Sequence, residues 1–182
     1  MGFGYDNYQT VMRVIRTGNA EQSGKMYHYL EDLFLCSRLP SGRVLRYAYP
    51  RIEMVTTPWG KEQLGVTFMT MKKPQNAHKE VDISDDDEIG DGKWIRIQAS
   101  PGLFTENYTQ AIARDIMVES AFRCEFEYGY PITMSIHDEL VAEVPEGHRS
   151  LEEFEQVMAQ IPTWAAGLPV ACEGWEGYFY RK

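Results

Sequence analysis

Apolar and polar positions along this chain repeat with two different periods. Three segments follow the period of a helix, and they cover residues 8–16, 105–128 and 150–160. Alternating or short apolar segments predict strands at 25–30, 33–39, 43–49, 63–71, 93–98, 132–136 and 140–144, and Gly-punctuated extended segments at 170–180. Strands and helices do not alternate regularly, so the pattern favours an α+β fold.

The helical segments carry signals for their ends and their buried faces. Thr105 is the expected N-cap of the longest helix, and Ser150 with Glu153 forms a capping-box pattern at the start of the last one. The expected buried face of the first helix is formed by Val11, Met12 and Ile15. The expected buried side of the longest helix is formed by Tyr108, Ile112, Met117, Ala121, Cys124 and Phe126.

A short polar stretch, His137-Asp138-Glu139, separates two apolar strand segments and predicts the tip of a hairpin. Two interpretations are open from the pattern alone. The stretch is either an ordinary polar turn, in which Asp is common, or a site for a divalent cation. Hard cations such as Mg²⁺ bind carboxylate oxygens and keep waters or phosphates as further ligands. His137 by itself is more typical of a hydrogen-bonding residue than of a catalyst.

The charges are distributed unevenly over the 182 residues. The formal net charge of −9 argues at first against a nucleic-acid-binding protein, because phosphates are neutralised by Lys and Arg. However, residues 1–79 carry 11 Lys or Arg and 6 Asp or Glu, whereas residues 80–91 carry 7 acids and no base. Residues 92–182 carry 7 Lys or Arg and 14 Asp or Glu. The basic first part is therefore a credible DNA-facing segment.

The remaining residue counts and spacings argue against several kinds of site and several classes of protein. The three cysteines are too widely spaced for a disulfide framework or a zinc site, so buried free thiols in a reducing compartment are expected. His28, His78 and His148 have no ligand-like spacing. No apolar stretch is long enough to cross a bilayer and residues 1–6 do not resemble a secretory signal, so we expect a cytoplasmic protein without a membrane partner.

The hairpin sequence MSIHDELVAEVP (134–145) resembles the third motif of family A DNA polymerases. The resemblance implies a polymerase palm-like fold, in which an antiparallel sheet with a carboxylate-bearing hairpin packs on a long helix. It also implies that Asp138, assisted by Glu139, binds the catalytic Mg²⁺ ions. His137 is then expected beside the primer terminus.

Three further segments extend the resemblance over residues 8–182. ENYTQAIARDIM (106–117) is similar to the palm helix of phage members, which implies that Asn107 and Gln110 contact the minor groove and that Arg114 lines the groove or supports the helix. LPSGRVLRYAYPRI (39–52) resembles the Gly-Arg hairpin of the family. Arg43 and Arg46 within it are expected to contact phosphates, or else to be ordinary solvated surface residues. Residues 150–182 resemble the C-terminal end of phage polymerases.

The first motif of the family, which carries the partner aspartate, and the fingers helix that binds the triphosphate have no counterpart in this sequence. Two metals need carboxylates that bridge both ions. The sequence therefore predicts the C-terminal subunit of a split polymerase, inactive alone. Its expected partners are a second polypeptide with the missing motifs, primer–template DNA and deoxynucleoside triphosphates, in the host cytoplasm if a phage encodes it. Such a part of a domain is expected to expose apolar surface.

Two alternatives stay open. One is a non-catalytic DNA- or polymerase-binding regulator derived from a palm, which the apolar residue at position 103 favours, since phage relatives have a basic residue there. The other is a stand-alone metal-dependent phosphohydrolase, which the lack of a second carboxylate cluster disfavours. The expected organisation is a basic helix-plus-hairpin segment at 1–79, an acidic surface loop at 80–92, and the C-terminal palm part at 93–182.

Overall fold

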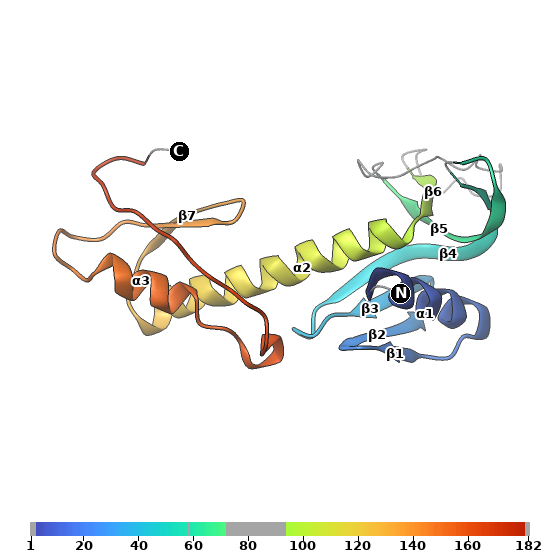
Figure 1. Cartoon of the computed structure of the whole chain (residues 1–182), viewed down its shortest axis with the longest axis horizontal. Helices are drawn as coiled ribbons and strands as arrows, with labels where there is room; N and C mark the ends of the chain where they lie inside the picture. Colours follow the sequence, from blue (N-terminus) through green and yellow to red (C-terminus); the bar gives the residue numbers. More distant parts are fainter. Residues whose placement is uncertain (1–2, 58, 72–93, 181–182) are drawn as a thin grey trace. The chain divides into compact units, whose positions relative to one another are not determined.

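The computed structural model describes residues 3–57, 59–71 and 94–180. The chain folds into two compact units, Met1–Gln110 (unit 1) and Ala111–Lys182 (unit 2), and both contain helices and antiparallel strands (Figure 1). The fold class is therefore α+β, as the sequence predicts. The predicted acidic loop at 80–92 lies outside the described residues.

Unit 1 is built on a six-stranded antiparallel sheet in which each strand pairs with the next one along the chain. Its strands are β1 (Glu21–Ser23), β2 (Met26–Glu31), β3 (Phe34–Arg38), β4 (Val44–Thr56), β5 (Glu62–Thr70) and β6 (Ile95–Ala99). The strands predicted at 25–30 and 33–39 are confirmed and form a hairpin, because β2 pairs with β3 up to Glu31 opposite Phe34. β6 pairs with β5 across the predicted acidic loop, so it belongs to the same sheet as the segments before that loop.

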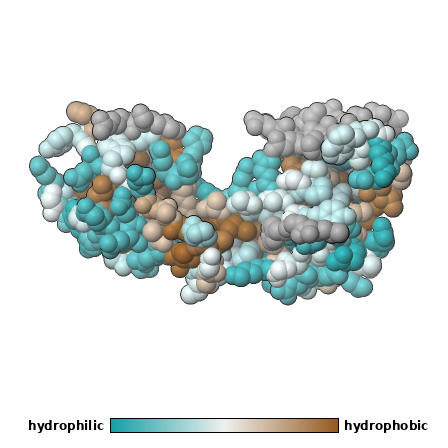
Figure 2. All heavy atoms as spheres, in the orientation of Figure 1, coloured by the Kyte–Doolittle hydropathy of each residue, from teal (hydrophilic) through white to brown (hydrophobic). Residues whose placement is uncertain are grey.

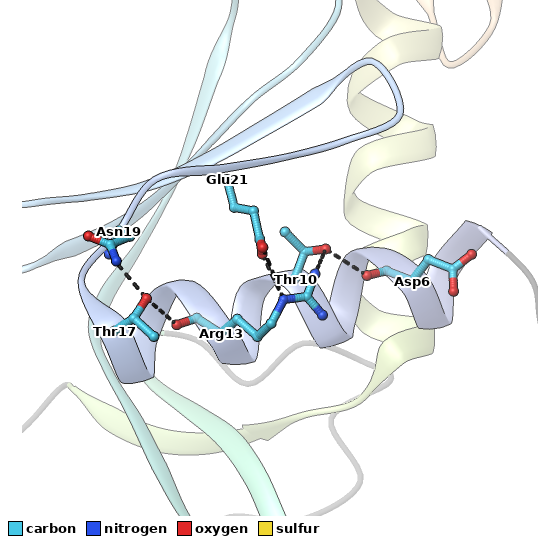
Figure 3. A network of polar contacts seen from close by, with 6 residues as sticks. All are labelled: Asp6, Thr10, Arg13, Thr17, Asn19 and Glu21. Carbon is cyan, nitrogen blue, oxygen red and sulfur yellow. Dashed lines mark hydrogen bonds and ion pairs between the residues drawn. The ribbon is translucent and has the colours of Figure 1, made fainter.

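Helix α1 (Phe3–Thr17) packs against the sheet of unit 1 and starts earlier than the pattern predicts. Its buried face consists of Asn7, Tyr8, Thr10, Val11 and Val14, so Val11 is confirmed while Met12 and Ile15 are only half-buried. Figure 3 shows how Arg13 ties the helix to β1: its guanidinium lies 2.9 Å from the Glu21 carboxylate and also donates to the Thr10 hydroxyl. The Tyr8 hydroxyl accepts a bond from the backbone N–H of Val66, which fixes the helix to β5.

Strand β4 continues past Tyr49, where the sequence predicts its end, because Pro50 is accommodated in a bulge. The register with β5 shifts between Ala48 and Arg51, and Tyr49 has a φ of 47°. Proline has no N–H to donate to the ladder, so a bulge is one of the few places where a strand tolerates it. The buried Arg96 guanidinium from β6 donates to the Tyr49 carbonyl at 3.0 Å and stabilises this bend.

Helix α2 (Pro101–Phe122) begins four residues before the predicted N-cap. The Ser100 hydroxyl accepts a bond from the Leu103 N–H, and Pro101 occupies the first helical position, where a missing N–H costs nothing. The expectation for Thr105 is therefore wrong: its hydroxyl donates to the Pro101 carbonyl from inside the helix. The helix continues as a π-helical turn, η2 (Arg123–Glu127), in which Phe126 is 74% exposed rather than buried as predicted.

The first part of α2 supplies the aromatic core of unit 1. Phe104 is fully buried, and its ring centroid lies 4.9 Å from that of Tyr47 and 5.8 Å from that of Tyr108. Phe68 and Tyr8 complete this aromatic group at 6.3 and 6.1 Å. Leu103, which departs from the motif that this segment resembles, is only 3% exposed and belongs to the same core.

Unit 2 packs a hairpin and a short helix on the end of α2. The hairpin is formed by β7 (Ile132–Ile136) and β8 (Glu139–Ala142), which make a two-stranded sheet of their own, separate from the six-stranded sheet of unit 1. The short helix is α3 (Leu151–Met158), followed by a 3-10 turn, η3 (Thr163–Ala165). The core residues are Cys124, Tyr130 and Val157, with Tyr128, Ile132, Ala142, Phe154 and Met158 packed against them.

Polar contacts satisfy both ends of α3. The predicted N-cap is confirmed, since the Ser150 hydroxyl accepts a bond from the Glu153 N–H at 3.1 Å. At the other end, Ser120 donates to the Met158 carbonyl and Arg123 donates to the Val157 carbonyl, each at 3.1 Å. Side chains of α2 and η2 thus bind the carbonyls that have no partner within α3. Residues 170–180, predicted to be extended, form no strand.

Large apolar side chains reach the surface of both units, as the brown spheres in Figure 2 show. Trp59 in unit 1 is 89% exposed, and the stacked rings of Phe122 and Phe126 are exposed in unit 2. The expected exposed apolar surface is thus present among the described residues. No helix in this part of the chain has the length and hydropathy that a membrane span requires. All three cysteines are free; Cys36 and Cys124 are buried and Cys172 is half-buried.

Candidate functional site

The hairpin β7–β8 presents the two carboxylates that the sequence singles out. Glu139 pairs with Ile136 as the first residue of β8, so the turn itself has only two residues, His137 and Asp138. This differs from the predicted three-residue tip. His137 has a φ of 52°, a left-handed conformation that a tight two-residue connection imposes. Both turn residues are exposed, whereas Glu139 is half-buried.

Glu139 is held by the C-terminal segment. The Tyr180 hydroxyl donates to Glu139 Oε2 at 2.9 Å. This bond, more than the neighbouring negative charge, raises the pKa of Tyr180 above its ordinary value, because the carboxylate favours the protonated phenol. The two adjacent acids therefore have different surroundings: the Asp138 side chain extends from the turn into solvent, and Glu139 is anchored.

The two carboxylates fit a magnesium ion as donors but are too few to form a complete site. They offer hard oxygen ligands on a short, fixed hairpin, which suits Mg²⁺. Within residues 3–57, 59–71 and 94–180, however, no three His, Cys, Asp or Glu side chains are grouped so that they could hold a metal ion. Asp138 and Glu139 are the residues of this chain that would hold Mg²⁺, and further ligands would have to come from outside the described residues.

Arg114 contacts the hairpin within unit 2. Its Nη1 donates to the Ser135 hydroxyl at 2.9 Å, two residues before the turn. The guanidinium itself is exposed. Of the two roles that the resemblance implies, this contact corresponds to support between α2 and β7, and it leaves the other guanidinium N–H groups at the surface.

The residues expected in the minor groove lie on the part of α2 that belongs to unit 1. The Asn107 amide donates to the buried Tyr47 hydroxyl at 3.4 Å. Gln110 is exposed and donates to Glu106 Oε1, one turn earlier in the helix, at 3.1 Å. Asn107 thus contacts the sheet, whereas Gln110, among the residues that the structure describes, is hydrogen-bonded within its own helix.

The two expected phosphate-binding arginines are exposed, and Arg46 lies on the face of the sheet opposite to Tyr47. Arg46 precedes Tyr47 in β4, and successive strand residues point to opposite faces. Because Tyr47 faces the buried side that α2 covers, Arg46 lies on the other face, where it pairs with Glu31 at 3.4 Å with both side chains 52% exposed. Arg43 is exposed at the turn before β4. That these two residues contact phosphates, rather than being ordinary solvated surface residues, stays a prediction.

A buried polar group that contacts the ring of Tyr108 is absent from the sequence-based predictions. The His28 ring is fully buried and contacts Ser37 Oγ at 2.9 Å and Asn7 Oδ1 at 3.1 Å. Burial lowers the pKa of His28 to about 4, although the nearby Glu21 carboxylate opposes the shift. The available signal was its position: His28 takes an inward-facing place in β2, between Met26 and Leu30.

Comparison with curated proteins relates this chain to a polymerase. A DNA polymerase of Bacillus phage SP02 is 31% identical over 179 residues, which cover 96% of this chain and 24% of that protein. The chain thus spans about a quarter of the length of its relative, to which it is homologous. No protein-family model matches the chain, and no solved structure matches it.

Proposed function

We propose that this chain is the C-terminal palm part of a family A DNA polymerase and supplies the metal-binding carboxylates for template-directed nucleotidyl transfer. The observation that supports this best is the position of Asp138, exposed in the two-residue turn of a hairpin whose sequence resembles the third motif of that family. The homology with part of a phage DNA polymerase supports the same reaction class.

In this proposal each residue has a defined task. Asp138 binds Mg²⁺ through its exposed carboxylate, and Glu139, oriented by Tyr180, assists it. When bound, two Mg²⁺ ions stabilise the attacking 3′ oxygen and the leaving oxygen of the triphosphate. His137 lies beside the primer terminus. Asn107 and Gln110 contact the minor groove, and Arg114 lines the groove or supports α2 through its contact with Ser135. Arg43 and Arg46 contact phosphates.

The remaining ligands come from outside this sequence. Since a two-metal site needs carboxylates that bridge both ions, we propose that a partner polypeptide brings the first motif and the fingers helix. Primer–template DNA and deoxynucleoside triphosphates are the substrates of the assembled enzyme. The chain alone is then inactive.

Primer extension tests the proposal. The chain is co-expressed with a candidate partner that carries the first motif, and the purified complex is assayed with Mg²⁺ and with no metal. We expect extension by the complex and a loss of at least about a hundredfold for Asp138→Ala, as for other essential electrostatic groups. Glu146→Ala, which removes an exposed acid in the nearby loop, is the matched control. Extension that persists in Asp138→Ala contradicts the catalytic assignment. If one polypeptide that carries all the motifs is active, this contradicts only the proposal that the chain is a separate subunit.

A second candidate is a non-catalytic regulator that binds DNA or a polymerase with the same surface. The incomplete ligand set among the described residues favours it. The apolar residue at position 103, by contrast, is explained by the core of unit 1 and favours neither function. A complex that binds DNA equally well with Asp138 or with alanine at that position, and never extends a primer, would support the regulator.

A further inference from the structure

A chain of buried hydrogen bonds crosses unit 1 and ends at Asn107. It links α1, three strands of the sheet and α2. His28 contacts Asn7 Oδ1 and Ser37 Oγ, and Ser37 Oγ contacts the Tyr108 hydroxyl at 3.0 Å. The Tyr108 and Tyr47 hydroxyls interact, and Tyr47 accepts the amide of Asn107. The six residues, in order, are Asn7, His28, Ser37, Tyr108, Tyr47 and Asn107.

The donor and the acceptor of each hydrogen bond from Asn7 to Tyr108 can be derived from the Asn7 end of this network. Because the Asn7 amide oxygen can only accept, His28 Nε2 carries the ring proton and Nδ1 accepts. Ser37 therefore donates its single proton to Nδ1, and the Tyr108 hydroxyl donates to Ser37 Oγ. The lowered pKa of His28 agrees with a neutral ring. These buried contacts join α1, β2, β3 and α2 through side chains with defined donors and acceptors.

Asn107 is the one member of this network that is not buried. Its contact with Tyr47 restricts the orientation of its side-chain amide. One N–H of Nδ2 donates to Tyr47 Oη, a hydroxyl that burial holds in place and whose pKa burial raises to about 12. Asn107 as a whole is half-buried, so part of its side chain reaches the surface of the helix. Minor-groove edges of A·T pairs present the acceptors N3 and O2, so only an amide turned with N–H outward binds them.

We propose that Tyr47 is a positioning residue that holds the Asn107 amide with an N–H directed outward, ready for an acceptor in the minor groove of the primer–template duplex. The inference rests on the proposed function, because it assumes that Asn107 faces DNA. Tyr47 itself lies beneath the helix and touches no DNA; it acts through Asn107. His28, Ser37 and Tyr108 in turn hold Tyr47.

Nuclear magnetic resonance of the whole chain tests the contact without DNA. The side-chain amide of Asn107 is assigned from the signal that Asn107→Ala removes. We expect slowed hydrogen exchange of this amide in the wild type and its loss in Tyr47→Phe. Tyr27→Phe, which removes a phenol hydroxyl on the opposite face of the sheet, is the control and keeps the protection. Equal exchange in wild type and Tyr47→Phe overturns the inference.

DNA binding by the complex used for primer extension tests the consequence. Duplexes with 3-deazaadenine at single positions lack one groove acceptor each. We expect one position at which this change weakens wild-type binding about two- to tenfold, the effect of one lost hydrogen bond. Tyr47→Phe and Asn107→Ala each abolish that sensitivity, and the double variant binds no more weakly than Asn107→Ala.

The two readouts separate the inference from the proposed function. Additive losses in the double variant, or sensitivity retained in Tyr47→Phe, overturn the positioning role while the duplex-binding role of Asn107 stands. Wild-type protein that binds no duplex overturns the proposed function, and with it the role in the groove. In that case the exchange measurement still decides whether Tyr47 holds Asn107.

Discussion

The Tyr180 hydroxyl lies 2.9 Å from Glu139 Oε2 and donates a hydrogen bond to it. A residue near the C-terminus thus binds the carboxylate next to Asp138, and the phenol keeps its proton more firmly because of that bond. This contact orients one of the two proposed metal ligands. It also gives Glu139 a spectroscopic reporter, since the ionisation of Tyr180 can be followed directly.

We expect Glu139→Gln to lower the pKa of Tyr180 towards its ordinary value. The amide carries no charge, so a phenolate beside it is opposed less than beside a carboxylate. Ultraviolet titration of phenolate formation, compared with Tyr180→Phe to identify the signal, measures the change. Glu173→Gln, an exposed glutamate in the same segment, is the control and leaves the pKa unchanged. An unchanged Tyr180 pKa in Glu139→Gln contradicts the contact.

Stability is expected to fall as the pH is lowered, because His28 is buried in its neutral form. Its pKa in the folded state is about 4, below that of an exposed histidine, so the unfolded chain takes up a proton first. The stabilisation is complete above about pH 6.5 and is lost as the pH falls towards 4. Between about pH 7.5 and 5 this amounts to about 2 kcal/mol in the free energy of unfolding.

Urea unfolding at several pH values tests the His28 prediction. His28→Gln should lose this part of the pH dependence, whereas His137→Gln, which changes an exposed histidine in the turn, should retain it. A wild-type free energy of unfolding that stays constant over this range would show that His28 titrates normally.

Ser150→Ala is expected to destabilise unit 2 by about 1 kcal/mol, because the Glu153 N–H loses its acceptor at the start of α3. Ser150→Asp preserves a side-chain oxygen at the cap and should retain most of the stability. Denaturant unfolding of the three proteins measures the difference. Equal losses in both variants would contradict a capping role.

Removal of the Phe104 ring should be far more costly than removal of an exposed phenylalanine. Phe104→Ala leaves a cavity among Tyr47, Tyr108 and their neighbours, and we expect a loss of about 3–5 kcal/mol. Phe126→Ala is the matched control and should change the free energy of unfolding by no more than about 0.5 kcal/mol. Comparable losses in the two variants would contradict the difference in burial.

Local patterns predict most elements of this fold, because periodicity and turn residues act over short distances. The β2–β3 hairpin and the Ser150 cap are found where the sequence places them. The predicted N-cap at Thr105 is wrong, because serine followed by proline at 100–101 is the stronger start signal. The predicted strand ends at Tyr49, whereas the bulge at Tyr49 lets β4 continue past Pro50.

For the candidate site, the sequence predicts the residues but not the contacts that hold them. A motif identifies Asp138 and Glu139, but Tyr180 is 41 residues away from Glu139 in sequence, and Tyr47 is 60 residues away from Asn107. No local pattern reports such contacts, since folding alone brings the partners together. His28 has the clearest signal in the sequence, because it is a polar residue at an inward-facing position of a strand.

Helix α2 supplies core residues to both units, and this limits how the protein can be divided for expression. Phe104 and Tyr108 complete the core of unit 1, while Ser120 and the following π-helical turn bind the end of α3. A cut between Gln110 and Ala111 would leave two helix fragments of about ten residues, which are marginal in water. Fragments intended to fold separately therefore need their boundaries outside Pro101–Glu127.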